Sequence, residues 1–260
     1  MQTSSWRRFS ALYSKELREL RPEIVIVVAA AVLICVTMFV KSGTSERDLL
    51  VLPIVLLMGL AGFLPFVATF KLLGREWSSN TIYLIMSLPA SGELILGAKL
   101  AALISQYLLG TLVVIASAVV WLYPHLPELV RSLNSMTGID MQLAQFIPGI
   151  AIAYLLSLTW LFYLISASFL SQLISKLFTR FNGAITLIAF VIILMLGSWL
   201  MEISRSFINT SSSINIVGTD VVSGLQQAIL FMGINSAIYF IAAGLIMMIS
   251  ILVYNYRIEL

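Results

Sequence analysis

The chain has 260 residues, of which 60% are hydrophobic and only 10% are charged, with a mean hydropathy of +1.02 and a formal charge of +3. Soluble domains carry about 25% charged residues, so this composition excludes an ordinary soluble protein and predicts helices that face lipid and one another. The length also excludes a separate soluble catalytic domain, because six spans with short connections use nearly the whole chain.

The first predicted element is an amphipathic helix within residues 1–23. Its apolar side chains recur at helical spacing, while arginine, lysine and glutamate fill the other face. The apolar members are Trp6, Phe9, Leu12, Tyr13, Leu17 and Leu20. Such a helix lies in the headgroup layer, with its aromatic side chains toward the membrane and its cations toward anionic lipid. We expect Pro22 to break this helix before the first span begins.

Six apolar segments follow, and each is long enough to cross a hydrocarbon core, which needs about 17–25 helical residues. Their predicted bounds are 24–40, 49–70, 100–123, 146–174, 184–201 and 228–256. They make an all-α polytopic membrane protein whose transmembrane domain covers 24–256. No segment has an acidic or basic residue at its centre, whereas ion-driven transporters usually keep an ionisable one at membrane depth. Any work that the protein does is therefore expected to be powered from outside its membrane core.

The positive charges predict the orientation. Of the 15 lysines and arginines, eleven fall on the side that holds both termini, while the acidic residues divide evenly. The positive-inside rule then places both termini in the cytoplasm of a multi-pass protein in the plasma (cell inner) membrane.

A cytoplasmic segment, 74–92, separates the second and third spans. It is too short to span and too apolar for a solvated loop. We expect Gly74 to end the second span, and Pro89 to stop a short helix over Thr81–Leu88. A short helix along the cytoplasmic face, between two spans, is what a soluble motor needs in order to move both of them.

This segment resembles the coupling region of type-2 ATP-binding-cassette (ABC) exporter permeases. Those proteins typically have a Glu after the second span, Gly-Thr before the short helix, Leu-Pro with a small residue, and a Lys at the start of the third span. The corresponding residues here are Glu76, Thr81, Leu88, Pro89, Ser91 and Lys99. The chain departs from the pattern at Asn80, where Gly is usual, and at Gly92, where a basic residue is common.

Two further stretches and the topology agree with this resemblance. Ser14–Arg21 is similar to the family's amphipathic start, with its Lys-Glu-Leu core at Lys15–Leu17. Tyr254–Leu260 is similar to the family's usual close of an aromatic residue, an Arg, an acid and a Leu. Six spans with both ends cytoplasmic also fit, so the resemblance covers the full length.

The resemblance implies the membrane subunit of an ATP-driven exporter. A second permease subunit, identical or paralogous, would complete the path, and cytoplasmic ABC ATPase subunits would bind ATP and Mg, so this chain itself would bind no cofactor. The implied coupling contact consists of Arg75, Glu76, Trp77, Thr81, Leu88 and Pro89. We expect Glu76 to lie at that contact and not in the core, so that Glu76→Lys would leave insertion intact but uncouple ATP hydrolysis from transport.

Uncharged polar residues within the spans are expected mostly to form hydrogen bonds between helices. Gln106 and Asn235 are the costliest to leave unpaired, and they are candidates for lining a substrate path. Catalytic patterns are missing from the sequence: it has neither a G-x-x-x-x-G-K-[ST] loop nor H-E-x-x-H, and it has one histidine, His125, and one cysteine, Cys35. The sequence thus predicts no enzyme, no metal site, no intramolecular disulfide and no nucleic-acid partner.

Two other functions stay open. A non-transporting membrane scaffold or signalling subunit would need no motor and would tolerate charge reversal at Glu76. An ion-coupled carrier would take up cargo along a gradient without ATP, which the charge-free spans argue against. The cargo is also open, although the apolar interior slightly favours an amphipathic or lipid-like molecule.

Overall fold

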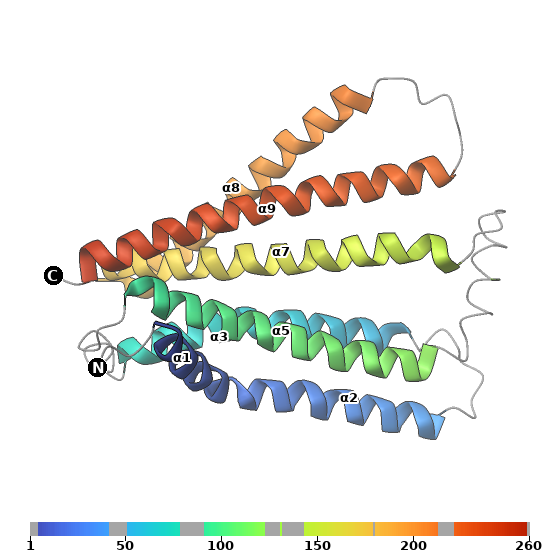
Figure 1. Ribbon diagram of the computed structural model, residues 1–260, viewed down its shortest axis with the longest axis horizontal. Coiled ribbons are helices and arrows are strands. Elements are labelled where there is room, and N and C mark those ends of the chain that lie inside the picture. The colour runs from blue at the N-terminus through green and yellow to red at the C-terminus, as the bar shows by residue number, and fades with distance from the viewer. Residues whose placement is uncertain are drawn as a thin grey trace. The chain divides into compact units, whose positions relative to one another are not determined.

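The computed structural model describes residues 5–41, 51–78, 91–122, 131, 143–178, 180–212 and 221–258. This part of the chain is helical and contains no strand (Figure 1). Its helices are α1 (Ser5–Glu19), α2 (Arg21–Lys41), α3 (Val51–Ser78), α5 (Gly92–Leu122), α7 (Leu143–Lys176), α8 (Asn182–Ser212) and α9 (Val221–Ile258). Five of them are individually long and apolar enough to cross a membrane, and the bent pair α1–α2 makes a sixth when counted as one span. The chain is therefore a polytopic all-α membrane protein.

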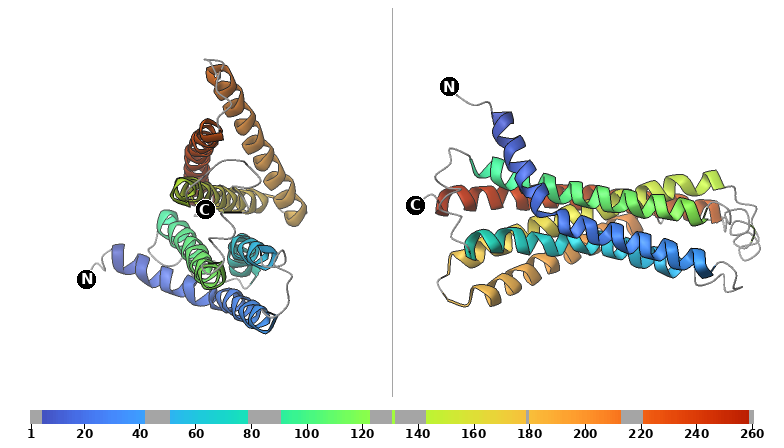
Figure 2. Two further views of the ribbon diagram at one scale, coloured as in Figure 1. Left: turned by 90° about the vertical axis from the view of Figure 1, so that its right-hand side faces the viewer. Right: turned by 90° about the horizontal axis from the view of Figure 1, so that it is seen from below.

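The chain bends by 48° between α1 and α2. Figure 2 shows α1 turning away from the line of α2. Pro22 explains the bend, because it has no N–H to donate to the carbonyl of Arg18 and its ring crowds the preceding turn. On either side of this gap, Leu20 N donates to Glu16 O at 3.1 Å and Ile24 N donates to Leu20 O at 3.2 Å. The predicted break thus takes the form of a bend in a nearly continuous helix.

Two compact units make up the chain, and the first, Met1–Gly138, contains α1, α2, α3 and α5. A cluster of small and branched side chains holds α2, α3 and α5 together. Its buried members are Val27, Ala31, Leu57, Ala61 and Val114. The approach of α3 to α5 is close, since a Cβ added to Gly110 would lie 3.3 Å from the Cβ of Ala61.

The second unit, Ile139–Leu260, contains α7, α8 and α9, with α7 and α9 side by side. The rings of Trp160, Tyr163 and Tyr239 pack on one another with centroids 4.8–5.7 Å apart. The buried Tyr163 hydroxyl donates to the carbonyl of Ile193 on α8. It passes so close to Gly197 that a Cβ there would lie 2.5 Å from the hydroxyl oxygen. Ring packing and this close approach fix α7 against both neighbours.

Helix boundaries differ from the predicted ones at the cytoplasmic segment. Gly74 does not end the second span, because α3 continues through it to Ser78. A glycine inside a helix costs only about 1 kcal/mol relative to alanine, so a single glycine does not by itself end a helix. Likewise α5 begins at Gly92, two turns before the predicted start of the third span. The predicted helix Thr81–Leu88 lies outside the described residues.

Candidate functional site

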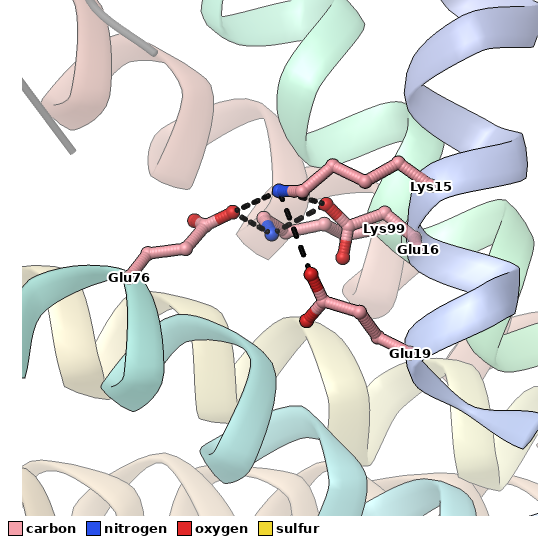
Figure 3. A network of polar contacts seen from close by, with 5 residues as sticks. All are labelled: Lys15, Glu16, Glu19, Glu76 and Lys99. Carbon is pink, nitrogen blue, oxygen red and sulfur yellow. Dashed lines mark hydrogen bonds and ion pairs between the residues drawn. The ribbon is translucent and has the colours of Figure 1, made fainter. Parts of the chain in front are cut away.

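The most unusual side chain of the first unit is Lys99, which lies in α5 and is only 1% exposed. Its ammonium Nζ donates to Glu76 Oε1 of α3 at 2.7 Å and to Glu16 Oε1 of α1 at 3.0 Å (Figure 3). Lysine is almost never fully buried unless it is paired, and here two carboxylates from two other helices supply the pairing.

Lys15 closes this arrangement into a ring. Its Nζ lies 3.1 Å from Glu76 Oε1 and 3.4 Å from Glu16 Oε1. Each of those oxygens therefore faces two ammonium groups, and the charges alternate around the ring (Figure 3). Glu19, one turn further along α1, lies 3.9 Å from Lys15 at the edge. We call Lys15, Glu16, Glu76 and Lys99 the four-residue ion network.

The four-residue ion network contains two ammonium groups and two carboxylates. The carboxylates affect the pKa of Lys15, the most exposed of the four side chains. Burial by itself lowers the pKa of Lys15, but the neighbouring carboxylates of Glu16 and Glu76 outweigh it, so the pKa is raised above its ordinary value. The network joins α1, α3 and α5 through ion pairs, and the second carboxylate oxygen of Glu16, Oε2, is buried without a hydrogen-bond partner in the described part of the chain.

Local packing brings α1 onto α5 so that the network can form. The Tyr13 hydroxyl donates to Ser105 Oγ at 2.9 Å, and the ring of Phe9 lies against Gly97. Trp6, Phe9 and Tyr13 also stack in sequence along α1. Part of the aromatic face that was expected to enter lipid therefore packs on a neighbouring helix instead.

A second ion pair ties α3 to α2. Lys71 Nζ donates to Glu23 Oε1, and Glu23 is only 8% exposed. Lys71 precedes Glu76 by five residues, so α3 carries one contact to the start of α2 and another to α1 and α5. The same end of the first unit is thus cross-linked by charge among all four of its helices.

The predicted coupling residues are only partly described. Arg75 is exposed, and Trp77 lies in α3, whereas Thr81, Leu88 and Pro89 lie outside the described residues. The expectation that Glu76 lies outside the core is wrong, because it is 6% exposed and bound to two lysines. The reason is that α3 continues past Gly74, which carries Glu76 onto the face that packs against α5 and α1.

Gln106 and Asn235 belong to different units. Gln106 is 3% exposed in α5, and neither of its amide atoms has a hydrogen-bond partner in the described part of the first unit. Asn235 is 1% exposed in α9 and donates to the carbonyl of Phe231 at 2.8 Å. Next to it, Ser236 lies 3.3 Å from Thr159 of α7, which is a hydrogen bond between helices. The expectation that most polar side chains of the spans form such bonds is nevertheless wrong, because most of them donate to a carbonyl of the preceding turn of their own helix, as Ser117 does to Val114 and Ser157 to Tyr154.

Sequence reasoning missed the network itself. It assigned Lys15 and Glu16 to the polar face of an interfacial helix, and connected Glu76 with Lys99 only through the resemblance. One signal was available in the sequence. Lys99 directly precedes an apolar span and follows Gly97 and Ala98, so in a helix that begins at Gly92 its side chain is expected to be withdrawn from water.

Within the described ranges, no group of three or more His, Cys, Asp or Glu side chains is placed to hold a metal ion. Comparison of the chain with protein-family models, with curated proteins and with solved structures finds no match.

Proposed function

We propose that this chain is the membrane subunit of an ATP-driven transporter of the type-2 ABC exporter class. Two such subunits, identical or paralogous, form the path in the plasma membrane. Separate cytoplasmic ATPase subunits hold ATP and Mg and act on the cytoplasmic end of the chain, where both termini lie.

The observation that carries this proposal is the four-residue ion network. Two of the three stretches that carry the resemblance meet in this network: Lys15 and Glu16 come from the N-terminal stretch, and Glu76 and Lys99 from the two ends of the coupling region. A buried ion pair rarely adds stability relative to an apolar pair, so its best use is to fix one geometry. Here the fixed geometry is that of the helices on both sides of residues 79–90.

A mechanical role follows from that position. Glu76 lies near the C-terminal end of α3, and Lys99 lies two turns into α5, so the network joins the helix that enters residues 79–90 to the helix that leaves them. Force applied by an ATPase at this segment would move α1, α3 and α5 as one body and not bend each helix separately. The exposed Arg75, one residue before Glu76, is the described residue best suited to touch the ATPase.

The absence of charge at the centres of the predicted spans supports an external energy source, since ion-driven carriers keep ionisable groups at membrane depth. The lipid-facing surfaces of the described helices are strongly apolar, with exposed side chains such as Leu112, Val120 and Leu187. We favour an amphipathic or lipid-like cargo because the predicted spans are apolar along most of their length.

The test is affinity purification of the full chain from its own host in mild detergent, with every co-purifying protein identified. A stoichiometric partner that carries a phosphate-binding loop supports the proposal. Repeated recovery without such a partner, under conditions that preserve other ABC complexes, overturns it in favour of a scaffold or signalling subunit. An Arg75→Glu variant purified in parallel tests the contact, because it should lose the partner while keeping its expression level.

A further inference from the structure

The turn between α7 and α8 displays apolar side chains beside positive charges. Phe181 is 81% exposed, and Leu177 and Phe178 are each exposed over roughly half of their surface. Lys176 and Arg180 are exposed as well. They are the only charged residues in the sequence from 141 to 201, a stretch that includes all of α7 and the apolar part of α8 up to Met201. The turn therefore offers three apolar side chains and two cations to its surroundings, with no acidic residue near them in the sequence.

Hydrogen bonds hold this turn in a defined shape. Leu177 N donates to Ile174 O at 3.0 Å, and Phe178 N donates to Ser175 O at 3.2 Å. Asn182, in the amide orientation that satisfies both its oxygen and its nitrogen, donates from Nδ2 to the carbonyls of Ser175 at 3.2 Å and Phe178 at 2.7 Å. The first residue of α8 is thus bound to the end of α7, and the apolar side chains are exposed by a folded turn.

The backbone of Phe181 is in a costly conformation. Its φ is 61°, in the left-handed region, where the Cβ of an L-residue crowds the backbone and bulky residues are rarely found. The largely exposed ring gains little from other parts of the chain in return. Strained residues persist where they have a function, so this displayed ring indicates a partner outside the chain.

The length of α8 places this turn relative to the membrane. Its apolar part, Asn182–Ile203, has 22 residues, which is about 33 Å of helix against a hydrocarbon core of about 30 Å. Figure 1 shows that α8 is inclined to α7 and α9, so its reach across a bilayer is shorter still. Asn182 must therefore lie near the edge of the core, and Phe181, which directly precedes it, lies in the headgroup layer.

We propose that the α7–α8 turn binds anionic lipid. Phe178 and Phe181 enter the boundary between headgroups and acyl chains, where aromatic side chains are favoured, and Lys176 and Arg180 bind lipid phosphates. The positive-inside rule assigns the turn to the cytoplasmic side, and the leaflet on that side carries the anionic lipids. A soluble protein fits less well, because a turn within the headgroup layer does not project from the membrane. The proposal needs neither an ATPase nor transport.

The experiment reports on lipid next to the turn in the full-length chain. Leu177→Cys, in a Cys35→Ser background, is labelled with the fluorophore NBD and placed in nanodiscs of phosphatidylcholine and phosphatidylglycerol. Quenching by either lipid carrying a doxyl group high on its acyl chain gives the ratio of the two lipids at this position. We expect both lipids to quench, with phosphatidylglycerol preferred. Lys176→Gln and Arg180→Gln should each lower that preference by about fivefold, the factor equivalent to about 1 kcal/mol per cation at an anionic surface.

Two further variants separate lipid binding from folding. Arg75→Gln removes an exposed cation from the first unit and should keep the preference at position 177. Phe181→Gly should unfold at or above the wild-type temperature, because glycine adopts a positive φ without strain, yet its label should be quenched less by both lipids.

The proposal is overturned if neither lipid quenches the label, or if removing both cations leaves the preference unchanged. It is also overturned, in favour of a protein partner, if the label is open to aqueous iodide until an ATPase subunit is added. The lipid measurement uses the chain alone, so its failure would leave the transporter proposal standing.

Discussion

The ammonium of Lys99 lies 2.7 Å from the carboxylate of Glu76, and both side chains are almost completely withdrawn from solvent. Removing one member leaves an uncompensated buried charge, whereas removing both can be nearly neutral. We therefore expect Lys99→Met to lower the unfolding free energy by about 3–5 kcal/mol. The double variant Lys99→Met with Glu76→Leu should recover most of that loss, because Lys15 and Glu16 still balance each other. Chemical unfolding of the four chains of this cycle measures the coupling, and additive losses would contradict the network.

The raised pKa of Lys15 predicts how its contribution depends on pH. When the pKa of a lysine is higher in the folded state than in the unfolded state, its charged form stabilises the fold. This stabilisation is complete at pH values below the pKa of the unfolded state, about 10.4, and it is lost as the pH rises through the pKa of the folded state. The groups that face Lys15 are Glu16, Glu19 and Glu76. The difference in unfolding temperature between wild type and Lys15→Gln should be constant from neutral pH to about 10 and shrink above it. A difference that instead shrinks between pH 6 and 8 would assign the effect to another group.

Charge reversal at Glu76 has a different expected result now that the residue is known to be buried. Glu76→Lys would face Lys15 and Lys99 with a third ammonium, so it should destabilise the first unit before any question of coupling arises. Arg75→Glu, at an exposed position, should lower the unfolding temperature far less than Glu76→Lys does. Under the proposed function it should also lower the transport-linked ATPase rate in proteoliposomes. Equal unfolding temperatures for Glu76→Lys and the wild type would show that the buried pairs do not hold the helices.

Gly197 is the tightest glycine contact of the second unit. A Cβ there would lie 2.5 Å from the hydroxyl oxygen and 2.8 Å from Cζ of Tyr163, whose ring is buried and cannot move aside. Overpacking of this kind costs about 1–3 kcal/mol, and Gly197→Ala should destabilise by that amount. Gly244→Ala is the control, because nothing lies within 4 Å of its added Cβ. Thermal unfolding should show the control unchanged or slightly more stable, and an equal loss in both variants would refute the contact.

The helices themselves could be predicted from sequence because apolar runs of this length have few alternatives. The bend at Pro22 was also predictable, since a missing N–H acts locally. The ends of the spans were not, because no local pattern shows that the helix continues through Gly74 to Ser78. The partner that Glu76 then binds, Lys99, is 23 residues away in the sequence and lies outside any local window.

The site was predictable only in pieces. The resemblance pointed to Glu76 and Lys99 separately, and amphipathicity assigned Glu16 to a solvated face, whereas the structure buries all three together. A hydropathy value is averaged over residues that are neighbours in the sequence. It therefore cannot show that a charged side chain is neutralised by an oppositely charged side chain of another helix.

The hydrogen bond between Glu16 and Lys99 joins residues that are 83 apart in the sequence. This separation determines when, during synthesis of the protein, the bond can form. When Glu16 leaves the ribosome, its partner has not yet been made, so the carboxylate stays hydrated at the membrane surface while the first two spans enter the bilayer. Docking of α1 onto α5 begins only after the chain has been translated beyond Lys99. A nascent chain truncated between Glu76 and Lys99 should accordingly leave α1 open to protease, and the full first unit should protect it.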